Sequence, residues 1–191
     1  MEVVLSLCLG FGLAAACGFR VFVPFLVMSV AHRAGHLDLS GRFEWLGSDV
    51  ALGVLALATV LEIAAYYVPW LDNLLDGAAT PIAVVAGTMA AAATMSGASP
   101  LLEWTLAAIG GGGAAGVVQT GSVLLRGLSS VSTAGFGNPI VSTAEAGSAL
   151  TVSALAILIP PLALVLLTVV LALALRTASR VGGGSGALDA T

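Results

Sequence analysis

The residue best placed to do chemistry in this sequence is a single carboxylate inside an apolar segment. Glu62 lies about twelve residues into an apolar stretch that covers residues 50–68. A carboxylate within a membrane is costly, and such groups usually face a charged partner or a water-filled cavity. We therefore expect Glu62 to bind a proton or a cation. The alternative is a structural role, as a hydrogen-bond acceptor or as an ion-pair partner of Arg20.

Two arginines could neutralise the acids that the apolar segments contain or adjoin. Arg20 lies inside the first apolar stretch, and Arg126 directly follows the fourth. Pairing of Arg20 with either Glu62 or Glu145 would satisfy both charges, as lipid requires. By the internal similarity described below, Arg126 and Glu44 would form the matching pair. These pairings are hypotheses.

Two further acids are spaced for one helix face. Asp72 and Asp76 lie four residues apart in a short acidic connection. Two such carboxylates could attract cations to the mouth of a permeation path. The alternative is a solvated acidic loop in which Asp72 caps a short helix.

The sequence shows no pattern of an enzyme or of a nucleic-acid-binding protein. It contains no nucleophile elbow, phosphate-binding loop or His-Glu-x-x-His motif. The ten acids outnumber the six bases, which are all arginine, and the net charge is −4. No basic surface for nucleic acid is therefore expected. We expect no catalytic residue, no metal site and no cofactor.

The composition points to a helical membrane protein. Of the 191 residues, 59% are hydrophobic and 8% are charged. In soluble domains about 45–50% of residues are hydrophobic and about 25% are charged. The apolar runs are long and unbroken, as membrane-spanning helices require. We therefore predict an all-α, polytopic protein with five or six transmembrane segments, embedded in the lipid bilayer.

The apolar segments form one transmembrane domain over residues 1–175. The last segment has 29 residues and would be about 43 Å long as one helix, so it tilts, protrudes or breaks, most readily at Pro160-Pro161. A break there gives a sixth segment. Residues 126–145 read as a polar loop, and residues 176–191 as a disordered tail. The five expected spans cover residues 3–31, 50–68, 81–95, 101–125 and 147–175.

The distribution of the arginines predicts how the chain is oriented in the membrane. With five spans, four of them fall on one side of the membrane, which should be the cytoplasmic side. This places the N-terminus outside and the C-terminus in the cytoplasm, with the protein in the inner (plasma) membrane. The four are Arg33, Arg42, Arg176 and Arg180.

A weak internal repeat has a spacing of about 100 residues. The segment 47–58 resembles 147–156, and small residues recur every fourth position in the first and fourth spans, at positions 10, 14 and 18 and at 112, 116 and 120. Such stripes let helices pack closely in lipid, so these two spans should cross near the centre. Three spans separate the copies, so the halves 1–98 and 99–175 would insert in opposite directions, as in many transporters.

Four segments carry a resemblance to a known family. They are Gly18-Phe19-Arg20 with Pro24, the run Phe43-Glu44-Trp45-Leu46-Gly47-Ser48, Glu62 with Pro69 and Asp72, and the run Gly137-Asn138-Pro139-Ile140-Val141-Ser142 followed by Glu145. Over roughly residues 3–175 the chain resembles the bacterial membrane family known as domain of unknown function 4126. The resemblance implies a multi-span helical membrane protein and supplies no established activity. The family typically shows Glu-Asp where this chain has Glu145-Ala146.

We expect a small transporter or channel-like protein for an ion or a small polar solute. The candidate binding residues are Glu62, Arg20, Asp72, Asp76, Glu44, Arg126, Asn138 and Glu145. The alternatives are a non-transporting scaffold or assembly protein, and a lipid-handling protein that meets headgroups with its arginines. One small bundle leaves a thin permeation path, so we expect a homo-oligomer, with a dimer favoured.

The surroundings of Glu62 discriminate between these functions. A continuous polar cavity that reaches the carboxylate would favour transport. A dry carboxylate paired with arginine would favour a scaffold. A lateral groove that opens to lipid near an arginine would favour lipid handling.

Overall fold

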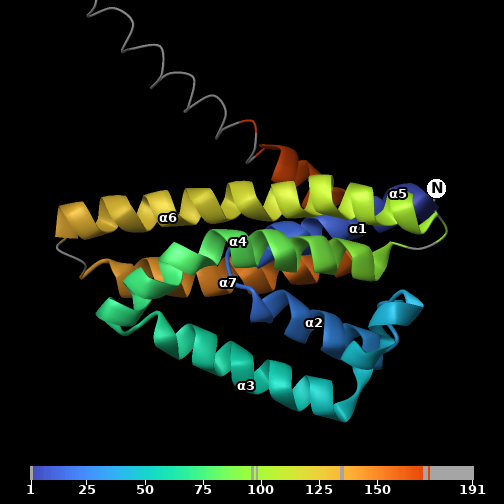
Figure 1. Ribbon diagram of the computed structural model, residues 1–191, viewed down its shortest axis with the longest axis horizontal. Coiled ribbons are helices and arrows are strands. Elements are labelled where there is room, and N and C mark those ends of the chain that lie inside the picture. The colour runs from blue at the N-terminus through green and yellow to red at the C-terminus, as the bar shows by residue number, and fades with distance from the viewer. Residues whose placement is uncertain (1, 96, 98, 134–135, 170–171, 173–191) are drawn as a thin grey trace, which may run out of the picture.

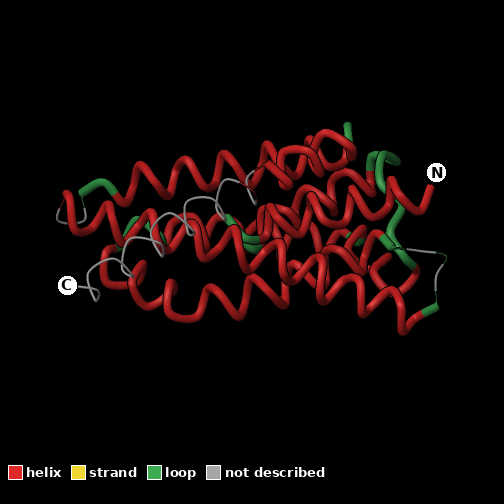
Figure 2. The backbone as a smooth tube through the Cα atoms, turned by 90° about the horizontal axis from the view of Figure 1, so that it is seen from above, coloured by secondary structure: helices red, strands yellow, loops and turns green. Residues whose placement is uncertain are grey.

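The computed structural model is an elongated bundle of helices (Figures 1 and 2). It describes residues 2–95, 97, 99–133, 136–169 and 172. Within these residues the chain forms helices, turns and loops and contains no strand. The predicted all-α class is confirmed.

The longer helices run along the bundle, and short loops join them (Figure 1). α5, η2 and α6 follow one another without a loop, and η2 is a π-helical turn inside this long helix. An additional short apolar helix covers Pro160–Val169. In chain order the elements are α1 (Glu2–Cys17), α2 (Phe22–Arg33), η1 (Gly41–Gly47), α3 (Asp49–Ala65), α4 (Pro69–Thr94), α5 (Pro100–Leu106), η2 (Ala107–Gly112), α6 (Gly113–Thr133) and α7 (Asn138–Leu158).

The first apolar stretch does not form one long helix. α1 runs toward the middle of the bundle, the chain turns at residues 18–21, and α2 runs back toward the same end (Figure 1). Gly18 packs so closely on α6 that a Cβ there would lie 2.5 Å from the carbonyl oxygen of Ala115. Pro24 falls in the first turn of α2, where its missing N–H breaks no helical hydrogen bond. The expected first span therefore becomes two short helices, and the turn between them lies inside the protein.

Three described helices are long and apolar enough to cross a membrane. A fourth candidate is the pair η1 and α3, which is bent by 71°. The expected five or six spans are not confirmed, because the first apolar stretch is divided by its turn. The inverted repeat is not confirmed either: Arg20 lies in the turn between α1 and α2, whereas Arg126, its expected counterpart, lies within the continuous helix α6. The three ranges are Gly77–Thr94, Pro100–Thr133 and Asn138–Leu158.

The polar loop expected over residues 126–145 is wrong. α6 continues to Thr133 and α7 begins at Asn138, with Pro139 in its first turn, where proline is favoured. Arg126 and Glu145 therefore both lie within helices. The expected break in the last stretch is present, since α7 ends at Leu158, just before Pro160.

Small residues allow the central helices to approach closely. A Cβ on Gly87 of α4 would lie 2.9 Å from the carbonyl oxygen of Gly111 in η2, and a Cβ on Gly111 would lie 2.8 Å from that of Gly87. Only glycine permits such backbone contact, which replaces the hydrophobic driving force that lipid cannot supply. α1 also meets α6 at Gly18, as the small-residue pattern predicts.

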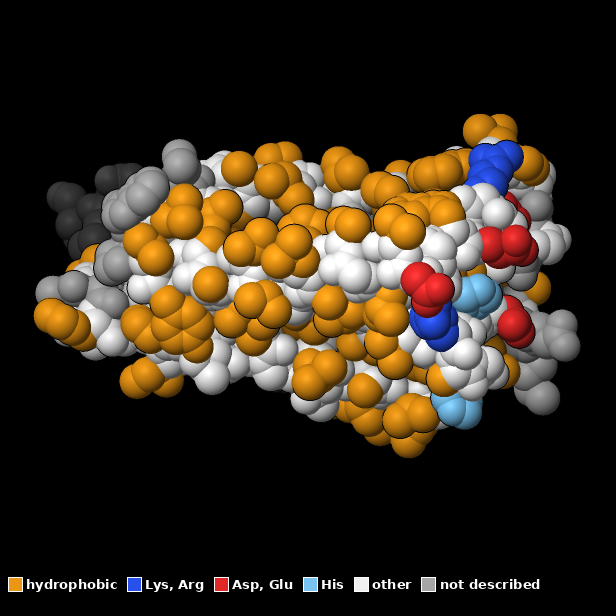
Figure 3. Space-filling model, turned by 90° about the horizontal axis from the view of Figure 1, so that it is seen from below, with side chains coloured by type: hydrophobic (Ala, Val, Ile, Leu, Met, Phe, Trp, Pro, Cys, Tyr) orange, Lys and Arg blue, Asp and Glu red, His pale blue; other side chains and the backbone are white. Residues whose placement is uncertain are grey.

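The outer surface is mostly apolar along the bundle. Figure 3 shows apolar side chains over most of one face, with the charged and histidine side chains gathered at the end where η1 lies. Arg33 and Asp49 form an exposed ion pair of 2.7 Å at that end of the molecule. Apolar sides with a polar end are the distribution that a bilayer imposes on a helical protein.

Candidate functional site

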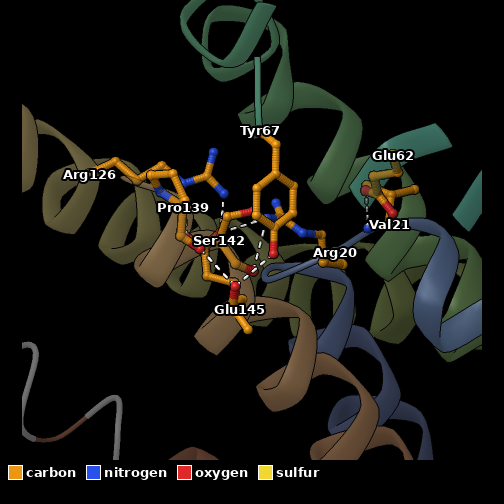
Figure 4. Close-up of polar contacts among 9 residues, drawn as sticks. Arg20, Val21, Glu62, Tyr67, Arg126, Pro139, Ser142 and Glu145 are labelled. Atoms are coloured by element: carbon orange, nitrogen blue, oxygen red, sulfur yellow. Dashed lines mark hydrogen bonds and ion pairs between the residues drawn. The ribbon is translucent and has the colours of Figure 1, made fainter. Parts of the chain in front are cut away.

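One buried carboxylate holds two arginines in the interior of the bundle. The Arg20 Nη2 atom lies 3.2 Å from Glu145 Oε2, and Arg126 Nε donates to Glu145 Oε1 at 3.0 Å. Arg126 Nη2 also pairs with Glu145 Oε2. All three side chains are buried, and Arg20 is only 1% exposed. Figure 4 shows the two arginines reaching Glu145 from different sides.

The elements that position these groups are distant in sequence. Arg20 comes from the turn between α1 and α2, Arg126 from α6, and Glu145 from α7. Ser142 precedes Glu145 by three residues and so shares its helix face. Arg20 Nη2 donates to Ser142 Oγ at 2.6 Å and to the Ser142 carbonyl oxygen at 3.2 Å. α7 thus supplies three acceptor atoms to one buried guanidinium.

An aromatic ring contacts both guanidinium groups. Tyr66 follows α3 directly, and its ring centroid lies 3.8 Å from Arg20 Cζ and 4.1 Å from Arg126 Cζ. A ring face that meets a cation contributes about 0.5–2 kcal/mol, and more where water is excluded. Tyr66 is not among the residues predicted from the sequence, although it lies one helical turn after Glu62. We call Arg20, Tyr66, Arg126, Ser142 and Glu145 the arginine cluster.

Glu62 binds backbone N–H groups, and no ion pair with Arg20 is formed. Its Oε1 atom accepts a hydrogen bond from Val21 N at 2.7 Å, and Oε2 accepts one from Phe22 N at 3.0 Å. These donors begin α2, where a negative charge is favoured. Glu62 lies in the last turn of α3. Figure 4 shows it beside Val21 and apart from Glu145.

A cavity of about 410 Å³ lies next to Glu62 and the arginine cluster. We call it the lateral cavity, and its walls come from residues 19–22, α3, α4 and α6. Arg20, Glu62, Tyr66 and Gln119 are its polar lining residues, and the others are apolar. The lining residues Leu61 and Ile82 are 59% and 48% exposed, so the cavity opens on the apolar side of the bundle.

Two nitrogen atoms of Arg20 find no hydrogen-bond acceptor in the described part of the chain. They are Nε and Nη1, both fully buried in a side chain that lines the lateral cavity. A buried donor without a partner costs about 1–3 kcal/mol, and more when it is charged. Buried polar groups are nearly always paired, so an unsatisfied guanidinium beside a cavity is a place where a ligand oxygen would be stabilised.

The remaining candidates from the sequence lie elsewhere. Glu44 is exposed in η1, at the opposite end of the bundle from the end of α6 that carries Arg126 (Figure 1). The expected Arg126–Glu44 pair is therefore wrong, and Glu145 takes that place. Asn138 Nδ2 donates to Ser130 Oγ at 3.0 Å, which joins α7 to α6. The side chains of Asp72 and Asp76 lie outside the described part of the structure.

The apolar helices and the buried arginine cluster define a helical membrane protein. The chain belongs to the family described as domain of unknown function (DUF4126), whose profile matches residues 7–180. The resemblance noted in the sequence is thereby confirmed, and the family's description assigns no activity. No curated protein and no solved structure matches the chain.

Proposed function

We propose that this membrane protein handles an anionic membrane amphiphile. The charged headgroup would bind in the lateral cavity beside Arg20, and its hydrocarbon chain would remain in the surrounding lipid. One observation carries the proposal: Arg20, whose buried guanidinium has two unsatisfied nitrogens, lines a cavity that opens between exposed apolar side chains.

The size and lining of the cavity favour an amphiphile. Its volume of about 410 Å³ falls within the range of ligand sites, which is about 300–1,000 Å³. Apolar walls that hold a few polar groups bind a partly apolar ligand and orient its polar end. Leu61 and Ile82 at the mouth would contact the first part of the chain. A hydrated ion would require more polar groups than these walls offer.

Transport of an ion or a small polar solute is the second candidate. The turn between α1 and α2 lies inside the bundle, with Glu62 beside it. Many transporters bind their substrates at such interruptions of helices. We rank this candidate second because most of the cavity lining is apolar. A scaffold role would explain the ion pairs of Glu145. It would not explain the lateral cavity.

Lipids retained by the purified protein test the proposal. We would identify them by native mass spectrometry for the wild type, for Ala65→Trp and for Ala64→Trp. Ala65 lines the cavity, whereas its neighbour Ala64 is exposed and does not. We expect the wild type and Ala64→Trp to retain anionic lipid. Ala65→Trp should retain about tenfold less, since a bulky ring removes the binding space.

Two results would count against lipid handling. Equal lipid retention by Ala65→Trp and Ala64→Trp would mean that the cavity is not the binding site. Flux of a small ion or solute through reconstituted wild-type protein, lost in Glu62→Gln and without selective lipid retention, would favour the transporter instead.

A further inference from the structure

We propose that the lateral cavity selects anionic lipids whose headgroup carries hydroxyl groups, with the phosphodiester beside Arg20 and a hydroxyl group beside Glu62. This inference rests on the function proposed above and adds the chemical class of the headgroup. Three observations carry it: the unsatisfied donors of Arg20, the acceptor oxygens of Glu62 and the side-chain amide of Gln119, all of them on residues that line one cavity.

Arg20 supplies donors for the anionic part of the headgroup. Its Nε and Nη1 atoms are buried and find no acceptor in the described part of the chain, and the residue lines the lateral cavity. A phosphodiester oxygen accepts strong, charge-assisted hydrogen bonds from a guanidinium group. The phosphodiester of a lipid therefore belongs beside Arg20.

Glu62 offers acceptors to the same cavity. Its two oxygens accept from Val21 N and Phe22 N, as the oxygens of an ionised carboxylate do, and each oxygen has acceptor capacity left for a ligand. A second anionic oxygen placed against this carboxylate would be repelled. The part of the ligand that lies beside Glu62 must therefore be a hydrogen-bond donor.

The groups for the anion and for the donor come from the same turn of the chain. Arg20 ends the turn between α1 and α2, and the two residues whose N–H groups hold Glu62 follow it directly. Figure 4 shows Glu62 beside Val21. All of these residues line the lateral cavity. A headgroup that carries its donor a few bonds from the phosphorus atom can therefore serve Arg20 and Glu62 together.

Gln119 favours a hydroxyl group over an ammonium group as this donor. It lines the cavity from α6 and is only 4% exposed. Among the residues that the structure describes, none forms a hydrogen bond with the Gln119 side chain. A buried amide needs partners both as a donor and as an acceptor. Hydroxyl groups donate and accept, whereas an ammonium group only donates, so a glycerol headgroup can serve Glu62 and Gln119 at once.

A matched pair of lipids isolates the effect of the hydroxyl groups. Short-chain phosphatidylglycerol and short-chain phosphatidylmethanol are both phosphodiesters with one negative charge, and only the first has headgroup hydroxyl groups. Charged groups around the cavity therefore affect both lipids alike. Short-chain phosphatidylethanolamine supplies an ammonium donor instead, and inorganic phosphate tests whether a free anion suffices. Calorimetric titration of the purified protein in a non-ionic detergent gives the affinity for each probe.

We expect the wild type to bind phosphatidylglycerol at least about tenfold more tightly than each of the other three probes. Glu62→Gln should lower the preference for phosphatidylglycerol over phosphatidylmethanol to less than about threefold, because an amide is a weaker acceptor than a carboxylate. Gln119→Met, which removes the amide from a side chain of similar length, should lower the preference by a smaller factor. Asp38→Asn, an exposed acid outside the site, should keep the wild-type preference.

The possible failures are distinguishable. Equal binding of phosphatidylglycerol and phosphatidylmethanol by the wild type overturns this inference and leaves lipid handling intact. Phosphatidylethanolamine that binds as tightly as phosphatidylglycerol overturns the choice of a hydroxyl group. An unchanged preference in Glu62→Gln and in Gln119→Met overturns the roles of these residues, and Gln119→Met keeps this test open if Glu62→Gln does not fold. Absence of binding of both anionic lipids by the wild type overturns lipid handling itself.

Discussion

Arg20 and Glu145 meet in the interior of the bundle, with Arg20 Nη2 at 3.2 Å from Glu145 Oε2. The pair joins the turn between α1 and α2 to the first half of α7. Arg126 of α6 binds the same carboxylate. One acid therefore holds three elements together, next to the lateral cavity that Arg20 lines.

Glu145→Gln should destabilise the protein strongly. The change removes the carboxylate that binds both buried guanidinium groups, and breaking a buried pair in this way costs about 3–5 kcal/mol. Thermal unfolding in detergent measures the effect. The matched control is Asp49→Asn, which breaks the exposed pair with Arg33 and should barely change the melting temperature. Similar melting temperatures for the two variants would contradict a structural role for Glu145.

Arg20→Lys should impair binding more than Arg126→Lys does. Lysine keeps the charge but cannot stack on Tyr66 and bind several acceptors at once. Both variants lose this geometry, but only Arg20 lines the lateral cavity. We expect phosphatidylglycerol affinity to fall by about tenfold in Arg20→Lys and by less than about threefold in Arg126→Lys. A larger loss of affinity in Arg126→Lys would indicate that the lipid binds near Arg126 and outside the lateral cavity.

Tyr66→Leu should lower stability through the loss of two ring–cation contacts. Each contact contributes about 0.5–2 kcal/mol, so the unfolding free energy should fall by about 1–4 kcal/mol. Tyr67 is the matched control, because its hydroxyl group bonds to Thr143 Oγ1 at 2.7 Å at an exposed position. Unfolding in denaturant should show a smaller loss for Tyr67→Leu. Equal losses would mean that the contacts between Tyr66 and the arginines contribute little.

Gly87→Ala should weaken the packing of α4 on η2 and α6. A Cβ at this position would lie 2.5 Å from Ala115 Cβ and 2.9 Å from the Gly111 carbonyl oxygen, so the helices must separate. Gly121 in α6 has nothing within 4 Å of such an atom. Gly121→Ala should leave stability unchanged or raise it by up to about 1 kcal/mol. Thermal unfolding of both variants tests this difference, and equal melting temperatures would show that the close crossing is dispensable.

The sequence was sufficient for the fold class and for one correct partner. A charge in an apolar segment must find a counter-charge, and this requirement, together with the apparent repeat, made Glu145 a candidate partner for Arg20 beside Glu62. The choice between Glu145 and Glu62 depends on where the chain turns after α1. At that turn Gly18 packs on Ala115, a contact between residues far apart in sequence.

The extent of the helices could not be predicted from hydropathy. Arg126 and Glu145 were predicted to bound a polar loop, and their pairing with each other was not among the expected pairs. In the bundle they neutralise each other, so the surrounding residues remain helical. Tyr66 was missed for a related reason, since its ring gains a role only when two guanidinium groups are brought to its faces.

The most direct test of lipid handling is an experimental structure of the wild-type protein in nanodiscs that contain phosphatidylglycerol. We predict density in the lateral cavity, with an oxygen within hydrogen-bond distance of Arg20 Nε or Nη1 and a chain that leaves between Leu61 and Ile82. A lateral cavity without lipid density, at a resolution that defines the Arg20 side chain, would contradict this account.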